Sequence, residues 1–399
     1  MFLGVALGGK RKIVISGYYG FGNLGDEAIL SSIIERLEES VGDLEVVVLS
    51  NSSSVEMSGR PGVRCIGRLS PISVFREMLG ADLVISGGGG LLQDSTGFST
   101  VVYYLGIVKL ALMMGKKVLF YAQGVGPLSL EKSRSMVRSV CNGVSLIAVR
   151  DADSAALLRE IGVSRPPVVV TADPVMAMKP MPDSDADRFL SSVLPGLIKG
   201  GKPRVAVSVR PWNSENDYEG AVAAACDSIA EKYGADIYLI PFQISQDYPV
   251  CLSVSKKMKA PATMVAPGGP DKTVFQYSSK EMAAILSRMD AVVAMRLHAL
   301  ILAASSAVPA AGIIYDPKVK AFADSAGMES WDLDRVTSGD VVGFMDRIVE
   351  DREKISGAIL ERTAALRAKA LATASIAADL IEGVSPRDIV AKRGLDLYD

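Results

Sequence analysis

Short apolar runs alternate with segments of helical periodicity through the first half of the chain. The apolar runs are rich in valine, isoleucine and leucine and largely lack a polar residue at every second position, which is typical of parallel strands covered on both faces. Strands are predicted at residues 12–16, 44–49, 82–86, 117–121, 145–149 and 168–170, and helices at residues 27–40, 99–114, 131–142 and 153–161. This alternation predicts a doubly wound sheet with right-handed crossovers.

A segment rich in proline and aspartate, residues 177–187, interrupts the pattern, which then starts again. Strands are predicted at residues 204–209, 236–240, 291–294 and 310–314, and helices at 219–233, 280–289, 298–306, 341–350 and 352–382. The predicted fold class is α/β, with two Rossmann-like domains facing across a cleft at the carboxyl ends of their strands. The N-terminal domain is predicted over residues 1–178, a linker with one helix over 179–203, and the C-terminal domain, including the terminal helices, over 204–399.

Charge and cysteine content exclude several classes of protein. The 399 residues carry a formal net charge of −2 without a dense basic tract, so we expect no nucleic acid partner, because binding a phosphate backbone needs a clustered basic surface. The four cysteines, Cys65, Cys141, Cys226 and Cys251, lack the spacing of a metal site, and the chain has one histidine. We therefore expect no metal, and interpret the thiols as small buried apolar groups in a reducing compartment.

The sequence argues against both a secretory signal and a membrane span. At the N-terminus a short apolar stretch precedes the basic residues, the reverse of the order in a signal peptide. The longest apolar region, residues 283–315, is interrupted by Arg288, Asp290, Arg296 and His298, whereas a span needs about 20 uninterrupted apolar residues. We expect a cytoplasmic protein, for which peripheral contact with the inner face of a membrane stays open. The sequence does not indicate an oligomeric state.

The first predicted strand leads directly into a glycine-rich segment, GYYGFGNLGDEAIL, residues 17–30. Glycines such as Gly22 and Gly25 allow a ligand to approach the backbone, and the following helix directs free N–H groups at it. The segment is not a GxGxxG fingerprint, which disfavours a nicotinamide cofactor. The structural alternative is a tight turn with Asp26 capping the helix. The cluster of Asn23, Asp26 and Glu27 favours a functional loop.

A second glycine-rich segment, SGGGGLLQDS at residues 86–95, follows another predicted strand. Gly88, Gly89 and Gly90 would leave the backbone bare for a sugar or a phosphate group. Gln93 and Asp94 follow, and a carboxylate there could accept a hydrogen bond from a sugar hydroxyl or remove its proton. The alternative is a flexible turn without a ligand.

Cationic side chains follow several predicted strands. Arg150 ends one strand of the first domain, where it could bind a carboxylate or phosphate, or could pair with Asp151 or Asp153. In the second domain Arg210, Arg296 and Lys318 follow three strands; for Lys318 the alternative is a solvated side chain on a proline-started helix. His298, two residues after Arg296, is the sole histidine, so any imidazole chemistry takes place there.

In this order the segments GYYGFGNLGDEAIL, ISGGGGLLQD, YAQGVGPL, VRD, SVRPW, MRLHALILAA and YDPKVKAF resemble the polysaccharide pyruvyl transferase family, and most closely its bacterial cell-surface (CsaB-type) members. The resemblance covers most of residues 12–325. It implies a GT-B-like fold and transfer of pyruvate from phosphoenolpyruvate to two sugar hydroxyls, with formation of a cyclic ketal and release of phosphate. For CsaB-type enzymes the implied acceptor is N-acetylmannosamine in a lipid-linked precursor of secondary cell wall polysaccharide, whose ketal is bound by S-layer homology domains.

The resemblance carries functional residues over to Arg296, His298, Arg150 and Lys318. We expect Arg296, Lys318, Arg210 and Arg150 to hold the donor, with His298 as general acid/base. On the acceptor side we expect Asp94 or Asp26, with Gly22, Asn23, Gly25, Gly88, Gly89, Gly90 and Gln93 binding the sugar and pyrophosphate. Phosphoenolpyruvate is the donor substrate, and no cofactor is expected.

Two other functions remain open from the sequence. A GT-B architecture also serves nucleotide-sugar glycosyltransferases, which release a nucleoside diphosphate instead of inorganic phosphate. A non-catalytic module that binds a sugar phosphate would bind the precursor without consuming a donor. Convergent arginine, lysine and histidine at strand ends favour an enzyme.

Overall fold

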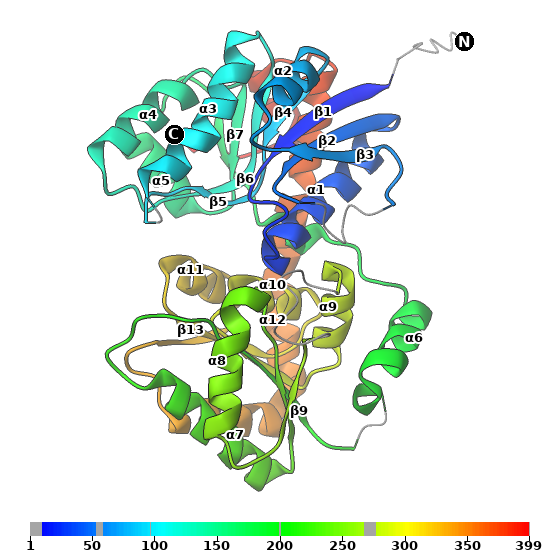
Figure 1. Cartoon of the computed structure of the whole chain (residues 1–399), viewed down its shortest axis with the longest axis vertical. Helices are drawn as coiled ribbons and strands as arrows, with labels where there is room; N and C mark the ends of the chain where they lie inside the picture. Colours follow the sequence, from blue (N-terminus) through cyan, green and yellow to red (C-terminus); the bar gives the residue numbers. More distant parts are fainter. Residues whose placement is uncertain (1–9, 53–58, 96, 199–200, 267–276, 399) are drawn as a thin grey trace. The chain divides into compact units, whose positions relative to one another are not determined.

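The computed structural model describes residues 10–52, 59–95, 97–198, 201–266 and 277–398 (Figure 1). The N-terminal stretch used in the argument against a signal peptide lies outside these residues. The chain forms two compact units. The first comprises the chain up to Phe21, Ile29–Met178, and the chain from Leu366 onward; the second comprises Gly22–Ala28 and Lys179–Ala365.

The first unit is built on a parallel sheet with the order β3-β2-β1-β4-β6-β7-β8, and the short strand β5 pairs with β6 outside this path. The strands are β1 (Arg11–Ser16), β2 (Leu44–Ser50), β3 (Val63–Gly67), β4 (Leu83–Ser86), β5 (Gly89–Leu92), β6 (Val118–Val125), β7 (Leu146–Val149) and β8 (Val168–Val170). The direction of strand order reverses between β1 and β4, which are both followed by glycine-rich segments. This is the switch point at which ligands bind in such sheets.

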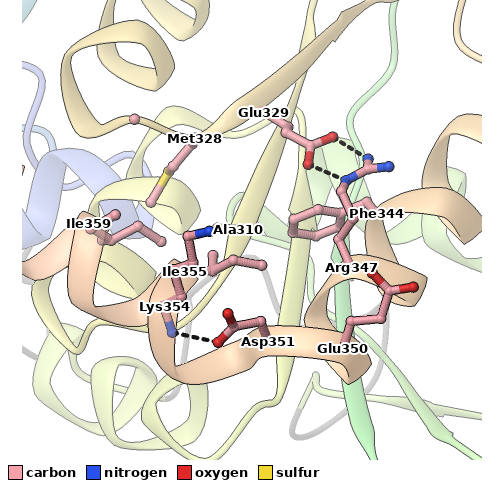
Figure 2. A pocket seen from close by; sticks show the side chains of 12 residues that line it. Ala310, Met328, Glu329, Phe344, Arg347, Glu350, Asp351, Lys354, Ile355 and Ile359 are labelled. Atoms are coloured by element: carbon pink, nitrogen blue, oxygen red, sulfur yellow. Dashed lines mark hydrogen bonds and ion pairs between the residues drawn. The ribbon is translucent and has the colours of Figure 1, made fainter.

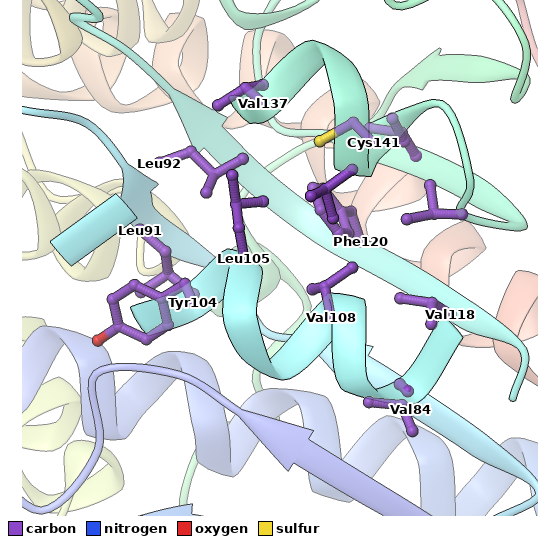
Figure 3. Packing of buried hydrophobic residues seen from close by; sticks show 14 of the residues in the cluster. Val84, Leu91, Leu92, Tyr104, Leu105, Val108, Val118, Phe120, Val137 and Cys141 are labelled. Carbon is purple, nitrogen blue, oxygen red and sulfur yellow. The ribbon is translucent and has the colours of Figure 1, made fainter. Parts of the chain in front are cut away.

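Helices cover the sheet of the first unit and bury its apolar strands. They are α1 (Leu24–Val41), α2 (Pro71–Leu79), α3 (Phe98–Met113), α4 (Glu131–Cys141), α5 (Ala152–Glu160) and α13 (Pro386–Arg393). Figure 3 shows Leu105 and Val108 of α3 packed on Val118 and Phe120 of β6. Every residue of β4, β6 and β7 is buried, which explains why the strands lack alternation.

The second unit contains a parallel sheet with the order β11-β10-β9-β12-β13-β14. Its strands are β9 (Arg204–Ser208), β10 (Asp236–Leu239), β11 (Ala262–Met264), β12 (Ala291–Ala294), β13 (Ala310–Ile314) and β14 (Glu329–Asp332). Its helices are α6 (Asp183–Val193), α7 (Tyr218–Tyr233), α8 (Ile244–Lys257), α9 (Ser279–Ser287), α10 (Leu297–Ser305) and α11 (Pro317–Ala326). The switch point lies between β9 and β12, so the prediction of two parallel α/β sheets is confirmed.

The C-terminal segment corrects one sequence-based assignment. Helix α12 (Ser338–Ile381) is interrupted at Asp351, where the backbone leaves the helical region, as expected from two helices meeting there. The prediction placed all of residues 204–399 in the C-terminal domain, but the chain from Leu366 onward packs in the first unit. Lys117 donates to the carbonyl of Leu380 at 2.6 Å, and the end of the chain pairs with β8. Helical periodicity shows that a helix has an apolar face, but it does not show against which domain's hydrophobic core that face packs.

Three cysteines fit the predicted interior environment and one departs from it. Cys141, Cys226 and Cys251 are buried, and burial raises the pKa of the Cys226 and Cys251 thiols to about 12. Cys65 on β3 is only half-buried. Among the described residues, each helix is too short or too polar to cross a bilayer.

Candidate active site

Four neighbouring strands of the second unit, β10, β9, β12 and β13, place polar side chains at their carboxyl ends. Gln243 follows β10, Arg210 follows β9, Arg296 follows β12 and Tyr315 follows β13. Because β9 and β12 flank the switch point, Arg210 and Arg296 lie where parallel α/β sheets bind ligands.

Arg296 is held in one orientation by a buried carboxylate. Its Nε donates to Oδ2 of Asp247 at 2.9 Å and its Nη2 donates to Oδ1 at 2.5 Å, with a longer contact of 3.3 Å to Gln243. Asp247 is fully buried and also accepts the backbone N–H groups of Phe242 and Gln243. The Asp247 carboxylate offsets most of the charge of the guanidinium and fixes the plane of the group. Arg296 can therefore direct hydrogen bonds at a ligand but does not act as a mobile cation.

His298 lies in the first turn of α10, where the sequence predicted it. The imidazole packs directly on Gly25: a Cβ atom at position 25 would lie only 2.1 Å from Nδ1 of His298. Only glycine leaves room for the ring in this position. Gly25 was predicted to bind the acceptor; in the structure it makes space for the imidazole.

The segment Gly22–Ala28 is attached to the second unit by backbone pairing. Leu24 N–H donates to the carbonyl of Phe242 at 2.9 Å, and Asn23 forms an antiparallel bridge with Gln243. The side-chain oxygen of Asn23 accepts the N–H of Gly25 at 3.0 Å, and Gly22 adopts a φ of +70°. Helix α1 therefore begins at Leu24, and Asp26 lies inside its first turn instead of capping it.

Arg210, Lys318 and two aromatic rings form a second part of the site. Arg210 Nη1 donates to the hydroxyl of Tyr315 at 3.1 Å, and its guanidinium lies 4.8 Å from the Tyr315 ring centre and 5.5 Å from that of Trp212. Since β12 lies between β9 and β13, this contact crosses the carboxyl end of β12. Arg210 thus connects the two sides of the strand that bears Arg296.

Lys318 belongs to the proline-started helix that the sequence offered as its structural alternative. Helix α11 begins at Pro317, and Asp316 caps it by accepting the N–H of Lys318 at 3.0 Å. The Lys318 ammonium lies 3.0 Å from the other oxygen of Asp316 and 6.0 Å from the Tyr315 ring centre. Its side chain is partly exposed, so an anionic ligand could reach it.

The glycines after β4, in the first unit, are packed more tightly than a flexible loop would be. Gly89 and Gly90 open strand β5, and Gly89 adopts a φ of +93°. A Cβ at Gly88 would lie 2.8 Å from Ile29, whereas a Cβ at Gly90 would meet nothing within 4 Å. Packing therefore explains Gly88, and Gly90 is the residue that leaves backbone open to a ligand.

Asp94 in the first unit is engaged by the backbone. Its two oxygens accept the N–H groups of Ser129 and Leu130 at 2.9 and 2.8 Å. Burial opposes ionisation, but these backbone hydrogen bonds prevail and lower the pKa of Asp94. The carboxylate thus orders the chain before α4, which favours a structural function over proton transfer. The preceding Gln93 is half-buried.

Arg150 lies at the end of β7 in the first unit, as predicted, and is paired there. Its side chain is 9% exposed and contacts Asp151 at 3.4 Å and Asp173 at 3.5 Å. The guanidinium also packs against Gly124, where a Cβ would lie 2.8 Å away. Arg150 therefore pairs with Asp151, one of the two partners that the sequence offered, and with Asp173, which the sequence did not suggest.

Sequence reasoning missed an aromatic cluster around Arg68 in the first unit. The guanidinium lies 3.9 Å from the ring centre of Tyr103 and 5.1 Å from that of Phe21, which stacks on Tyr18 at 4.2 Å. Phe21 and Tyr18 belong to the first glycine-rich segment. Arg68 is distant in sequence from its aromatic partners, so no sequence motif contains them together. The cluster becomes visible only in the folded structure.

A cavity of about 350 Å³ in the second unit lies outside the candidate site (Figure 2). It is lined by Ala310, the first residue of β13, by Glu329, the first of β14, and by residues of α12. Glu329 pairs with Arg347 at its edge. The cavity is therefore at the amino ends of β13 and β14, whereas the candidate site is at the carboxyl ends.

The sequence model for "Polysaccharide pyruvyl transferase" matches residues 23–317, well over half of the chain. The chain belongs to the polysaccharide pyruvyl transferase family. The match begins at Asn23, includes Gly25, Arg210, Arg296 and His298, and ends one residue before Lys318. As a polysaccharide pyruvyl transferase, the protein is an enzyme whose donor is phosphoenolpyruvate and whose acceptor is a polysaccharide.

Two further kinds of similarity support the family and the fold. The amylovoran biosynthesis protein AmsJ of Erwinia amylovora is 20% identical, over 86% of this chain and 93% of AmsJ. Among solved structures, S. aureus MnaA with UDP has a TM-score of 0.61 at 12% identity, covering 93% of this chain and 96% of MnaA. UDP-GlcNAc 2-epimerase from Neisseria meningitidis, bound to UDP-GlcNAc, has a TM-score of 0.59 at 10% identity, covering 94% and 99%. The likeness to the two solved structures establishes a GT-B-like fold. The family model describes polysaccharide pyruvyl transferases as a whole, so the match does not identify a CsaB-type subgroup.

The contact between Gly25 and His298 makes a direct prediction for this pyruvyl transferase. In Gly25→Ala the new methyl group displaces the imidazole, so we expect kcat to fall about ten- to hundredfold, since small misplacements of catalytic groups are costly. Gly357→Ala, whose Cβ meets nothing within 4 Å, is the matched control and should keep wild-type kcat. Steady-state phosphate release measures both. Wild-type kcat in Gly25→Ala would show that the imidazole position does not matter.

Proposed function

We propose that the enzyme transfers pyruvate from phosphoenolpyruvate to N-acetylmannosamine of a lipid-linked precursor of secondary cell wall polysaccharide. The product is a pyruvate ketal across two hydroxyls of the sugar, and the other product is inorganic phosphate. One observation carries the proposal: Arg210, Arg296, His298 and Lys318 follow three adjacent strands of one sheet, at or beside its switch point, in a chain of this family.

The charges of this cluster suit the donor. Phosphoenolpyruvate carries a carboxylate and a phosphate on neighbouring atoms. In the proposal Lys318, a point charge, and Arg210, stacked near Tyr315, bind these groups, while Arg296 adds directed hydrogen bonds from its fixed plane. Arg150 is left out of this arrangement, because it belongs to the first unit, where it contacts Asp151 and Asp173.

The proposed reaction begins with proton transfer from the His298 imidazolium to the methylene carbon of phosphoenolpyruvate. The central carbon then has oxocarbenium character, and one sugar hydroxyl adds to it and returns a proton to His298. The second hydroxyl adds as the bond from the central carbon to the phosphate oxygen breaks. Its proton leaves with phosphate or to solvent, so one ketal and one phosphate form for each donor consumed. Arg210, Arg296 and Lys318 stabilise charge developing on the phosphate.

For the acceptor side we propose Asp26, Asn23 and Gly22 of the first glycine-rich segment, which all belong to the second unit. Gly90 and Gln93 of the first unit stay a separate prediction. Asp26 is the proposed acceptor of a hydroxyl proton, because it follows Gly25, on which the His298 ring packs. In the first unit by itself, the aromatic cluster around Arg68 offers stacking surfaces for a sugar ring and a cation for a pyrophosphate. We propose a cytoplasmic reaction, since that is where phosphoenolpyruvate is made.

The test is incubation of the enzyme with phosphoenolpyruvate and N-acetylmannosamine-containing acceptors, followed by phosphate assay and product mass. The expected result is one phosphate released per acceptor, with the acceptor gaining the mass of pyruvate less one water. His298→Asn is the matched control and should release little phosphate. Nucleoside diphosphate release from a nucleotide sugar, without consumption of phosphoenolpyruvate, would instead indicate the glycosyltransferase alternative that the GT-B-like fold suggests. Binding without turnover would indicate a non-catalytic module.

A further inference from the structure

Helix α2 exposes an apolar face that no described residue of the first unit covers. Leu69, Ile72, Phe75 and Leu79 are 77%, 84%, 48% and 57% exposed. Ile72, Phe75 and Leu79 recur at a spacing of three and four residues, so they form one stripe along the helix. Single exposed apolar residues are ordinary, whereas a continuous stripe of large ones on one helix indicates an interaction surface.

The opposite face of α2 fixes the helix to the sheet. Val74 and Met78 are buried in the core of the first unit. Glu77 accepts from Lys12 at 2.5 Å and pairs with Arg64. The hydrogen bond from Arg64 lowers the pKa of Glu77 to about 2. Burial opposes this shift, and the hydrogen bond from Lys12 adds to it. The helix is therefore a firmly attached element whose outer stripe is apolar.

Helix α3 extends the same surface. The Tyr103 hydroxyl donates to the carbonyl of Arg68 just before α2, and Lys116 just after α3 donates to the carbonyl of Leu79 at 2.7 Å. The two helices are thus connected at both ends. Met113, near the end of α3, is also 76% exposed.

The charges on these two helices have one sign at the surface. Arg76 and Lys109 are exposed, and Lys116 lies at the end of α3. Glu77 is the sole acidic residue in the sequences of α2 and α3, and it is 4% exposed and paired. An apolar stripe flanked by cations, without an exposed carboxylate on either helix, complements the surface of a bilayer that contains anionic lipid.

We infer that the face formed by Leu69, Ile72, Phe75 and Leu79 with Arg76 and Lys109 docks on an anionic lipid bilayer. The apolar side chains enter the boundary between headgroups and acyl chains, and the cations contact the headgroup phosphates. The docking surface does not depend on the identity of the acceptor sugar or on the pyruvyl transfer chemistry.

Cosedimentation of the full chain with vesicles tests the inference. The wild type should bind vesicles of phosphatidylcholine with phosphatidylglycerol, and bind vesicles of phosphatidylcholine alone more weakly. The Ile72→Glu, Phe75→Glu double variant should lower the partition coefficient at least about tenfold. Arg76→Glu with Lys109→Glu should weaken binding to the anionic vesicles and reduce its salt dependence.

Leu360→Glu is the matched control, because Leu360 is 59% exposed on a helix of the second unit. This variant should bind anionic vesicles as the wild type does. All variants should release phosphate from phosphoenolpyruvate with a soluble acceptor at the wild-type rate, which separates docking from catalysis. Wild type that stays in the supernatant, or a double variant that sediments unchanged, would overturn the inference. A dimer in light scattering that the double variant dissociates, without vesicle binding, would assign the face to a second copy of the chain instead.

Discussion

Replacement of His298 by alanine is expected to lower kcat for phosphate release at least about a hundredfold. The side chain is half-buried in the first turn of α10, packs on Gly25, and is the sole imidazole in the chain. Proton transfer to the donor's methylene carbon therefore has no second histidine to perform it. Steady-state assays with saturating phosphoenolpyruvate and acceptor measure the effect.

The expected loss should be confined to the chemical step. His298→Ala should keep the wild-type circular dichroism spectrum and bind phosphoenolpyruvate within a few-fold of the wild type, because the cations that hold the donor remain. His298→Asn preserves most of the packing on Gly25 and should lose the same activity. A folded His298→Ala enzyme with wild-type kcat would remove the imidazole from the mechanism.

Arg296→Ala should affect stability and donor binding together. It leaves Asp247 as a buried carboxylate without its guanidinium, an arrangement that typically costs about 3–5 kcal/mol. The affinity for phosphoenolpyruvate should fall more than the affinity for the acceptor. Thermal unfolding and calorimetric titration of each substrate provide the two measurements.

A second variant separates the two effects of Arg296. Adding Asp247→Asn to Arg296→Ala removes the buried charge and should restore part of the lost stability, because the asparagine oxygen can still accept a backbone N–H. Donor affinity should stay low in this double variant. If the double variant binds phosphoenolpyruvate as tightly as the wild type, Arg296 only stabilises the fold around Asp247.

The strands that carry the candidate site could be predicted because parallel strands are buried on both faces. Runs such as Val205–Val207 and Ala291–Ala294 are uniformly apolar, and an arginine follows each within three residues. Since the carboxyl ends of parallel strands share one edge of a sheet, Arg210, Arg296 and Lys318 could be grouped before any coordinates. The resemblance to the polysaccharide pyruvyl transferase family, which the family model confirms, identified phosphoenolpyruvate as the donor.

Other features depended on contacts between residues distant in sequence. Strand β5 was missed because its glycines have no β propensity, and its pairing with β6 defines it. Helix α2 was not predicted either, although its apolar residues recur at helical spacing. The partners of Arg150 and Asp94 lie on other loops, so spacing could not show that both side chains were already engaged.

The central claim is that the carboxyl ends of β9, β12 and β13 bind phosphoenolpyruvate, and an experimental structure with this donor tests it most directly. We expect density for the donor against Arg210 and Lys318, with the methylene carbon on the side of His298. Density for phosphoenolpyruvate against the glycine-rich segment of β5 or around Arg68, with the cluster of the second unit empty, would contradict it.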